Sequence, residues 1–154
     1  MTHRQITSVG SSLIKAFEGF RSARYLCAAR VWTIGIGHAI RKGERWDSPT
    51  AIITEQEALE LFDKDNDEAE RAVSRLIRVP LEDCQFDALV SFTFNLGSGA
   101  LQASALRSML NRAEYFEASL QFDRWIWGGG RRLPGLIRRR KAERILFQTG
   151  VLII

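Results

Sequence analysis

A change of residue pattern early in the chain limits the folds available to it. Between Ala23 and Ile40 the sequence is rich in β-branched and aromatic residues, with Gly35 and Gly37 interleaved, and it lacks helical periodicity. We predict a small antiparallel sheet here, in which the two glycines permit a tight hairpin. Stretches with helical spacing lie on both sides of this run, and this order indicates an α+β fold.

The helix before the sheet is predicted from its apolar spacing and its end signal. Apolar residues from Val9 to Phe17 recur at helical steps, and Gly19 stands where a helix commonly ends. Glu18 is therefore expected at the C-terminus of this helix.

The helices after the sheet follow from similar signals. Thr54 and Glu57 have the spacing of a capping box, ahead of an apolar pattern that predicts a helix of about 20 residues. A buried helix is expected between Pro80 and Gly97. The rest of the chain predicts helical segments near 106–110 and 115–125, a flexible glycine loop at 128–130, and a last helix from Pro134 to near Gly150.

These elements predict one domain over residues 1–154 with two lobes. The minor lobe, at about 20–53, would hold the sheet, and the larger helical lobe would comprise about 54–154 together with the N-terminal helix. The long helix that begins after Thr54 would join the lobes. With 45% hydrophobic and 26% charged residues, the composition excludes a disordered chain. A substrate site is expected in a cleft between the lobes.

The net charge of +4 is concentrated near the C-terminus. Such a cluster suits a polyanion, but a solvated helix face is its more usual explanation, and no nucleic-acid-binding motif accompanies it. We therefore expect no nucleic-acid partner and no obligate membrane contact. The basic residues are Arg131, Arg132, Arg138, Arg139, Arg140, Lys141 and Arg144.

The two cysteines and the N-terminal residues indicate the compartment in which the protein is expected. Cys27 and Cys84 permit one disulfide at most, and we expect two free thiols. The N-terminal residues form no apolar signal-peptide core, and no run of 18 apolar residues follows. We expect a product that is soluble in the cytoplasm in which it is made.

Glu18 is the candidate acid. Cleavage of a glycosidic bond needs a carboxylic acid that is still protonated near neutral pH. At a helix C-terminus Glu18 faces the negative end of the helix dipole, and Phe17 and Phe20 would provide apolar surroundings. Both effects are expected to raise its pKa. A solvated glutamate without chemistry is the alternative on spacing alone.

Two motifs resemble the phage lysozymes and endolysins of glycoside hydrolase family 24. They are residues 13–19, LIKAFEG, and residues 31–38, VWTIGIGH. That family has a catalytic triad, and Glu18, Cys27 and Thr33 have the same spacing in this sequence. The resemblance extends through residues 94–97 and 135–143, and it implies a lysozyme-like fold.

The resemblance implies that Glu18 is the general acid and that Thr33 helps to orient the attacking water. Cys27 occupies the position where many members have aspartate, and an ordinary thiol is only slightly ionised at pH 7. Cys27 could be a thiolate base, a nucleophile or a small polar spacer, and we place activation or positioning of water first. Arg24 and Arg30 are close enough in sequence to favour a thiolate. A half-buried cysteine without chemistry is the alternative.

Three further residues are expected to contact substrate by resemblance. Phe94 and Asn95 match a family position after the central helix, although Asn95 could equally cap that helix. Arg124 could meet a peptide carboxylate, or be a surface arginine beside the core residue Trp125.

Other polar residues are expected to have structural roles. His38 lies at the sheet edge, where we favour a structural role over a hydrogen bond to the acid. A buried or partly buried ion pair that ties down the last helix is expected among Arg139, Arg140 and Glu143.

The predicted function is hydrolysis of the β-1,4 bond between N-acetylmuramic acid and N-acetylglucosamine in peptidoglycan, with inversion if Cys27 and Thr33 position a water. The alternatives are a lytic transglycosylase, which forms a 1,6-anhydro product, and a non-catalytic basic protein that binds wall or membrane. No metal or other cofactor is expected, because the sequence shows no cluster at metal-ligand spacing. We expect a monomeric phage endolysin that reaches the wall through a separate holin-like protein.

Overall fold

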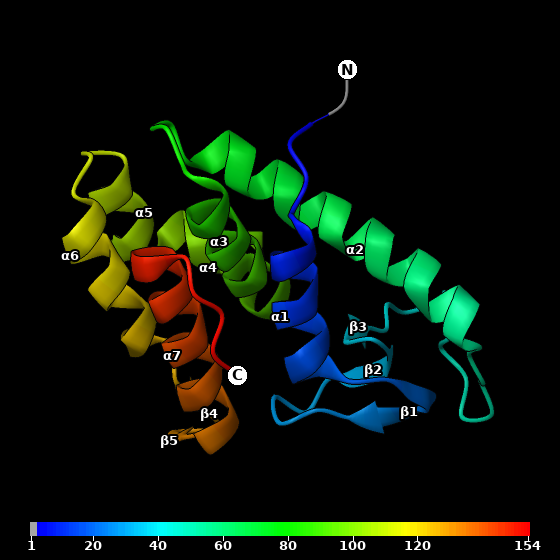
Figure 1. Ribbon diagram of the computed structural model, residues 1–154. Helices are drawn as coiled ribbons and strands as arrows, with labels where there is room; N and C mark the ends of the chain where they lie inside the picture. Colours follow the sequence, from blue (N-terminus) through cyan, green and yellow to red (C-terminus); the bar gives the residue numbers. More distant parts are fainter. Residues whose placement is uncertain (1–2) are drawn as a thin grey trace.

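The computed structural model describes residues 3–154 as a small sheet lobe and a larger helical lobe (Figure 1). The sheet consists of β1 (Arg21–Leu26), β2 (Trp32–Gly35) and β3 (His38–Ala39), antiparallel and in that order. Gly35, the last residue of β2, and Gly37, in the turn between β2 and β3, both have positive φ, 67° and 70°. The predicted hairpin and its use of glycine are therefore confirmed.

Helix α1 (Ser8–Glu18) precedes the sheet and ends at the candidate acid, as predicted. The Thr7 side chain accepts a hydrogen bond from the Val9 backbone N–H and so caps the start of the helix. Gly19, with φ of 65°, ends it and leads directly into β1. Glu18 thus lies where the helical lobe meets the sheet.

Helix α2 (Glu55–Leu76) extends from the sheet lobe across to the helical lobe (Figure 1). Its capping box is complete, because Thr54 Oγ1 accepts from the Glu57 N–H and the Glu57 carboxylate accepts from the Thr54 N–H. The predicted capping box and long connecting helix are confirmed.

The helical lobe is built around α3 (Asp83–Leu96), which is buried from Phe86 to Thr93. Because most of its residues face other elements, α3 forms the centre of the core. Around it lie α4 (Ser98–Ala103), α5 (Ala105–Leu110), α6 (Tyr115–Leu120), the 3-10 helix η1 (Gln121–Arg124), the two short strands β4 (Trp127–Gly128) and β5 (Arg131–Arg132), and α7 (Pro134–Thr149).

Three expectations about this lobe need correction. Helix α4 was not predicted, since it has only six residues and starts directly after Gly97. The helical segment expected at 115–125 is divided into α6 and η1. The glycine run is not a flexible loop but the turn of a β4–β5 hairpin, in which Gly129 and Gly130 have positive φ.

Two smaller findings concern the cysteines and the membrane. Cys27 and Cys84 are both free, as expected, and both are half-buried. Within residues 3–154 no helix is long and apolar enough to cross a bilayer.

Candidate active site

The Glu18 carboxylate lies at the meeting point of α1, the β2–β3 turn and α7. Its side chain is 15% exposed, and its Oε1 accepts a hydrogen bond from Arg139 Nη1 of α7. Its Oε2 packs against Gly37, where an added Cβ would lie only 2.5 Å away. Only a glycine at position 37 leaves room for the carboxylate.

This environment differs from the apolar one that the sequence suggested for Glu18. Phe20 is 41% exposed, and Phe17, which is half-buried, lies beneath the Arg139 guanidinium at 5.8 Å. The immediate partner of Glu18 is thus a cation, not an aromatic ring. Residue spacing could not predict this contact, because its partners are 121 residues apart.

Arg139 is itself held by other buried groups. Its Nε donates to Ser91 Oγ at 3.4 Å and lies 3.4 Å from Glu143 Oε1, and its Nη2 donates to the Ser91 carbonyl at 3.3 Å. The guanidinium is therefore held by α3 and α7 in addition to its contact with Glu18. Such support holds a functional side chain in one orientation.

Arg140 and Glu143 complete this buried network, and both are fully buried. Arg140 contacts Glu143 through Nε at 2.7 Å and Nη2 at 2.9 Å, and Nη2 also donates to Asn95 Oδ1. Burial lowers the pKa of Arg140, while the Glu143 charge opposes that change. The predicted ion pair on the last helix is confirmed, but the sequence analysis missed that Arg139 extends it to Glu18.

Cys27 and Thr33 converge on one backbone group in the β1–β2 hairpin. The Val31 carbonyl oxygen accepts from the Cys27 N–H at 3.0 Å and from Thr33 Oγ1 at 2.9 Å. Arg30 closes the turn by donating its N–H to the Cys27 carbonyl, and its own φ is 61°. The hydroxyl proton of Thr33 is thus engaged, which leaves its oxygen lone pairs as acceptors.

Tyr25 joins this group although the sequence analysis did not single it out. It pairs with Thr33 across β1 and β2, so both side chains project from the same face of the sheet. Burial raises the pKa of Tyr25, as do the nearby charges of Glu18 and Cys27, while Arg21 opposes this rise. Tyr25 is therefore close enough to both Glu18 and Cys27 for their charges to affect its pKa.

The suggestion that Arg24 favours a Cys27 thiolate finds no support in its position. The Arg24 guanidinium stacks on the Trp32 ring at 4.1 Å. Trp32 precedes Thr33 on β2, and successive side chains of a strand point to opposite faces. Arg24 is therefore engaged on the other face of the sheet from Thr33.

A groove of about 410 Å³ runs past Gly37 between the sheet lobe with α2 and the end of α3. Phe94 and Asn95 line it, as expected for substrate-contacting residues. Asn95 does not cap α3, because Gly97 occupies that position. Within residues 3–154, Arg124 is not among the residues that line this groove; it lies exposed in η1 beside Trp125, which packs on Phe92.

Comparisons with known proteins identify the family to which this architecture belongs. Residues 15–143 match the family described as Phage lysozyme. The chain belongs to the phage lysozyme family. The endolysin of Bacillus phage B103 is 39% identical over 147 residues, which are 94% of this chain and 54% of that protein. The endolysin of Salmonella phage P22 is 36% identical over 143 residues, 93% of this chain and 97% of that one.

A solved structure supports the same assignment. The endolysin from Escherichia coli O157:H7 phage FAHEc1 superposes with a TM-score of 0.85 at 29% identity, and the match covers 99% of each chain. The predicted α+β lysozyme fold is confirmed, as is a glycoside hydrolase of the lysozyme type at the level of the family. The chain spans about half the length of the Bacillus relative and nearly all of the P22 relative.

In this lysozyme-family chain His38 has a structural position. Its Nδ1 lies 2.8 Å from Asp65 Oδ2 and its Nε2 lies 2.8 Å from Glu44 Oε1. Burial opposes the charged form, but hydrogen bonds and charges from Asp65 and Glu44 outweigh it and raise the His38 pKa. His38 therefore ties β3 to α2 and to the loop between them, as the favoured interpretation predicted.

The basic cluster near the C-terminus is not one solvated face. Arg139 and Arg140 are buried, and Arg144 pairs with Asp123 at 2.9 Å. The exposed members are Arg131, Arg132, Arg138 and Lys141. The positive charge available to a polyanion is therefore smaller than the sequence suggests.

Proposed function

We propose that this protein is an N-acetylmuramidase that cleaves the β-1,4 bond between N-acetylmuramic acid and N-acetylglucosamine in peptidoglycan. The observation that carries the proposal is the position of Glu18. Its carboxylate is mostly buried, held by Arg139, and packed on Gly37, which lines the groove of about 410 Å³ between the lobes. Family membership supports the same substrate class.

In this mechanism Glu18 donates a proton to the glycosidic oxygen as the bond to the anomeric carbon breaks. A water attacks that carbon and loses its proton to a base, so one water molecule is consumed for each bond cleaved. Arg139 positions the Glu18 carboxylate and would stabilise the negative charge left after proton transfer. Phe94 and Asn95 contact the glycan where they line the groove.

Cys27 and Thr33 position the water in this proposal. Thr33 Oγ1 donates to Val31 and keeps lone pairs that can accept a hydrogen bond from water. Cys27 is anchored to the same carbonyl and is half-buried. We place Cys27 as a water-positioning residue or base, with inversion of the anomeric configuration as the stereochemical consequence.

Product analysis tests the reaction itself. Purified peptidoglycan is digested, and the muropeptides are examined by mass spectrometry. The account predicts reducing-end products one water heavier than 1,6-anhydro products, whereas anhydro products would identify a lytic transglycosylase. The anomer formed first, followed by NMR, should be inverted, and a retained anomer would contradict the water mechanism.

A substitution series tests Cys27. Cys27→Asp should keep high activity if the residue acts as a base, and Cys27→Ser should keep part of it if positioning suffices. Cys27→Ala should lose most activity while remaining folded. Full activity of the alanine variant would mean that the thiol has no role in catalysis. Cys84→Ala is the matched control for removal of a half-buried thiol.

The cellular setting belongs to the same proposal. We infer that the protein is a monomer that acts on the host cell wall and reaches it after a holin-like protein permeabilises the membrane. The endolysin relatives support this setting. Lysis that proceeds on schedule without any membrane-permeabilising partner would contradict it.

A further inference from the structure

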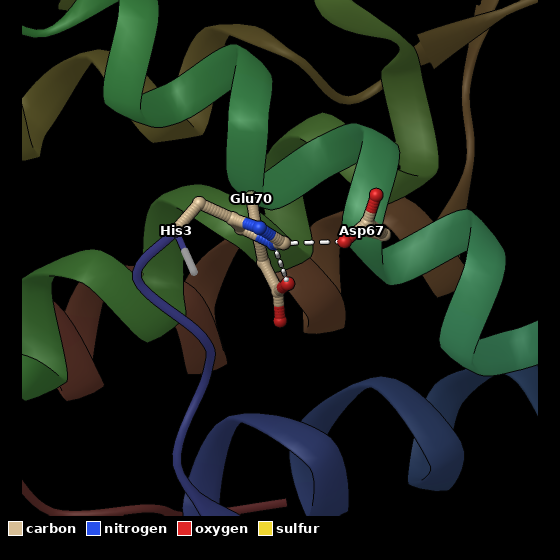
Figure 2. Close-up of side chains that lie close together, drawn as sticks. All are labelled: His3, Asp67 and Glu70. Atoms are coloured by element: carbon tan, nitrogen blue, oxygen red, sulfur yellow. Dashed lines mark hydrogen bonds and ion pairs between the residues drawn. The ribbon is translucent and has the colours of Figure 1, made fainter. Parts of the chain in front are cut away.

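A second polar cluster lies on α2 beneath the N-terminal segment. Figure 2 shows the His3 ring pointing at carboxylates of Asp67 and Glu70. His3 Nε2 lies 2.9 Å from Glu70 Oε2 and 3.0 Å from Asp67 Oδ1. The two acidic residues are one helical turn apart, so α2 presents both to the same ring.

The three groups form a donor set that suits a metal ion. One ligand atom from each residue lies within 4.8 Å of the other two. Neighbouring ligands around an ion at about 2.1 Å are separated by about 3.0 Å in octahedral and about 3.4 Å in tetrahedral geometry. The observed separations of 2.9 and 3.0 Å lie close to the octahedral value. One imidazole nitrogen with two carboxylate oxygens favours a transition metal over Mg²⁺ or Ca²⁺.

A buried polar group without a protein partner lies in the same hollow and is a second observation at this place. Asn66 is 5% exposed, and its side-chain oxygen has no hydrogen-bond partner among the described residues. Asn66 lines a hollow of about 400 Å³ together with Asp67 and Glu70, and it stands one turn before Glu70 on α2. A buried acceptor without a partner calls for an explanation such as an ion with its bound water.

The two carboxylates are already held in place by other groups. Glu70 Oε1 accepts the Ile6 N–H at 3.0 Å, and Asp67 Oδ2 accepts from Arg71 Nε at 2.8 Å. The hydrogen bond from Arg71 lowers the pKa of Asp67. Each acid therefore keeps one oxygen for its structural partner and turns the other toward His3, as metal ligands with outer support commonly do.

We propose that His3, Asp67 and Glu70 bind one divalent transition-metal ion, which fastens the N-terminal segment to α2. The Asn66 oxygen accepts a hydrogen bond from a water on that ion. No metal was expected because the sequence shows no cluster at metal-ligand spacing. His3 is more than sixty positions from the two acids, and only the fold brings the three residues together. His3 also lies outside residues 15–143, so the family match does not contain the complete set of three ligands. The hollow shares none of its lining residues with the groove beside Glu18.

Zinc binding by the whole protein, stripped with a chelator and then dialysed free of it, tests this site. Calorimetric titration with Zn²⁺ should give one ion per chain, and the melting temperature should rise with Zn²⁺ concentration. Co²⁺ should give a visible absorption band that Zn²⁺ abolishes. His3→Gln and Asp67→Asn should each lower the Zn²⁺ affinity at least about tenfold. Asp67 is tested as well as His3 because its side chain is 43% exposed, so that its replacement by Asn should leave the fold intact.

Asp63→Asn is the matched control, since Asp63 lines the same hollow without being one of the three ligands. It should bind Zn²⁺ as the unmodified protein does. The proposal is overturned if the unmodified protein takes up no Zn²⁺, or if His3→Gln binds it equally well. It is also overturned if binding is lost in Cys27→Ala or His38→Gln but not in His3→Gln. Lysozyme activity is not the readout, so failure of either proposal leaves the other unaffected.

Discussion

Arg139 holds the Glu18 carboxylate from the opposite end of the chain. Its side chain is 4% exposed, and Ser91 and Glu143 hold the guanidinium in its orientation toward Glu18. A small displacement of a catalytic group costs a large factor in rate. Arg139 is therefore a positioning residue, and its loss should disturb the orientation of the Glu18 carboxylate.

The substitution Arg139→Gln tests this role. Activity should fall about 10- to 100-fold, mainly in kcat, because the acid loses its fixed orientation. The free energy of unfolding should fall by about 3 kcal/mol, because Glu143 and Glu18 lose a buried partner. Lysis assays, a pH–rate profile and urea denaturation provide the measurements. The pH–rate profile should change shape, which a purely structural loss would not produce.

Arg138→Gln is the control for Arg139, because Arg138 is the exposed neighbour on α7. It should leave both rate and stability close to those of the unmodified protein. Equal effects of the two substitutions would contradict the positioning role.

At the scale of single residues, local signals predicted the position of Glu18 but not its partner. The helix-end glycine and the apolar spacing located Glu18 at the end of α1, as the structure confirms. The contact with Arg139 depends on how α7 packs against α3, and no local pattern in either helix encodes that packing. For the same reason, Tyr25 was not recognised beside Thr33.

At the scale of elements, the β2–β3 turn restricts substitution because it packs against the candidate acid. Gly37 has φ of 70°, and a methyl group there would lie 2.5 Å from Glu18 Oε2. Gly43 has a similar φ of 84° but has no heavy atom within 4 Å of the same position. A side chain at Gly43 would therefore cause backbone strain alone, whereas a side chain at Gly37 would also clash with Glu18.

Gly37→Ala and Gly43→Ala form the matched pair. Gly43→Ala should lower the free energy of unfolding by about 1 kcal/mol through its left-handed backbone alone, with activity retained. Gly37→Ala should cost about 1–3 kcal/mol more and reduce activity at least about tenfold, because Glu18 must move. Urea denaturation and lysis assays measure both. Equal activity of the two variants would mean that Glu18 does not depend on the open space at Gly37.

The elements that the sequence predicted well are those with strong end signals. The capping box of α2 and the left-handed Gly150 after α7 are both observed. Helix α4 escaped prediction because six residues hold too little periodicity. The glycine run at 128–130 suggested flexibility, whereas pairing of β4 with β5 makes it a tight turn.

Across the whole molecule, His38 links the sheet lobe to α2. It lies between Asp65 of α2 and Glu44 of the loop after β3, and its side chain is only 7% exposed. The two acids raise its pKa above the ordinary value near 6.5. The stabilisation is therefore fully present below about pH 6.5 and is lost as the pH rises through the pKa of the folded state.

His38→Gln tests this link. The substitution should cost about 1–3 kcal/mol of unfolding free energy at pH 6, where the imidazolium has both carboxylate partners. The cost should be smaller at pH 9, after the imidazole has lost its charge. Urea denaturation at the two pH values measures the difference, and His3→Gln without added metal serves as the second histidine control. An equal cost at both pH values would contradict the charged bridge.

The overall architecture was predictable because residue periodicity indicates helices and strands, and their order along the chain indicates the two lobes. What the sequence could not provide was the set of contacts between distant segments. Examples are the Glu18–Arg139 pair and the His3 cluster on α2, each of which forms only when the packed helices bring the residues together.

The central claim is that Glu18 supplies the acid for cleavage, and Glu18→Gln tests it most directly. The amide keeps the size of the side chain but cannot donate the proton, so clearing of purified peptidoglycan should fall at least about 100-fold. Glu117→Gln, at an exposed position of α6, should clear peptidoglycan at the unmodified rate. Circular dichroism should show that both variants are folded. Undiminished clearing by folded Glu18→Gln would contradict the account.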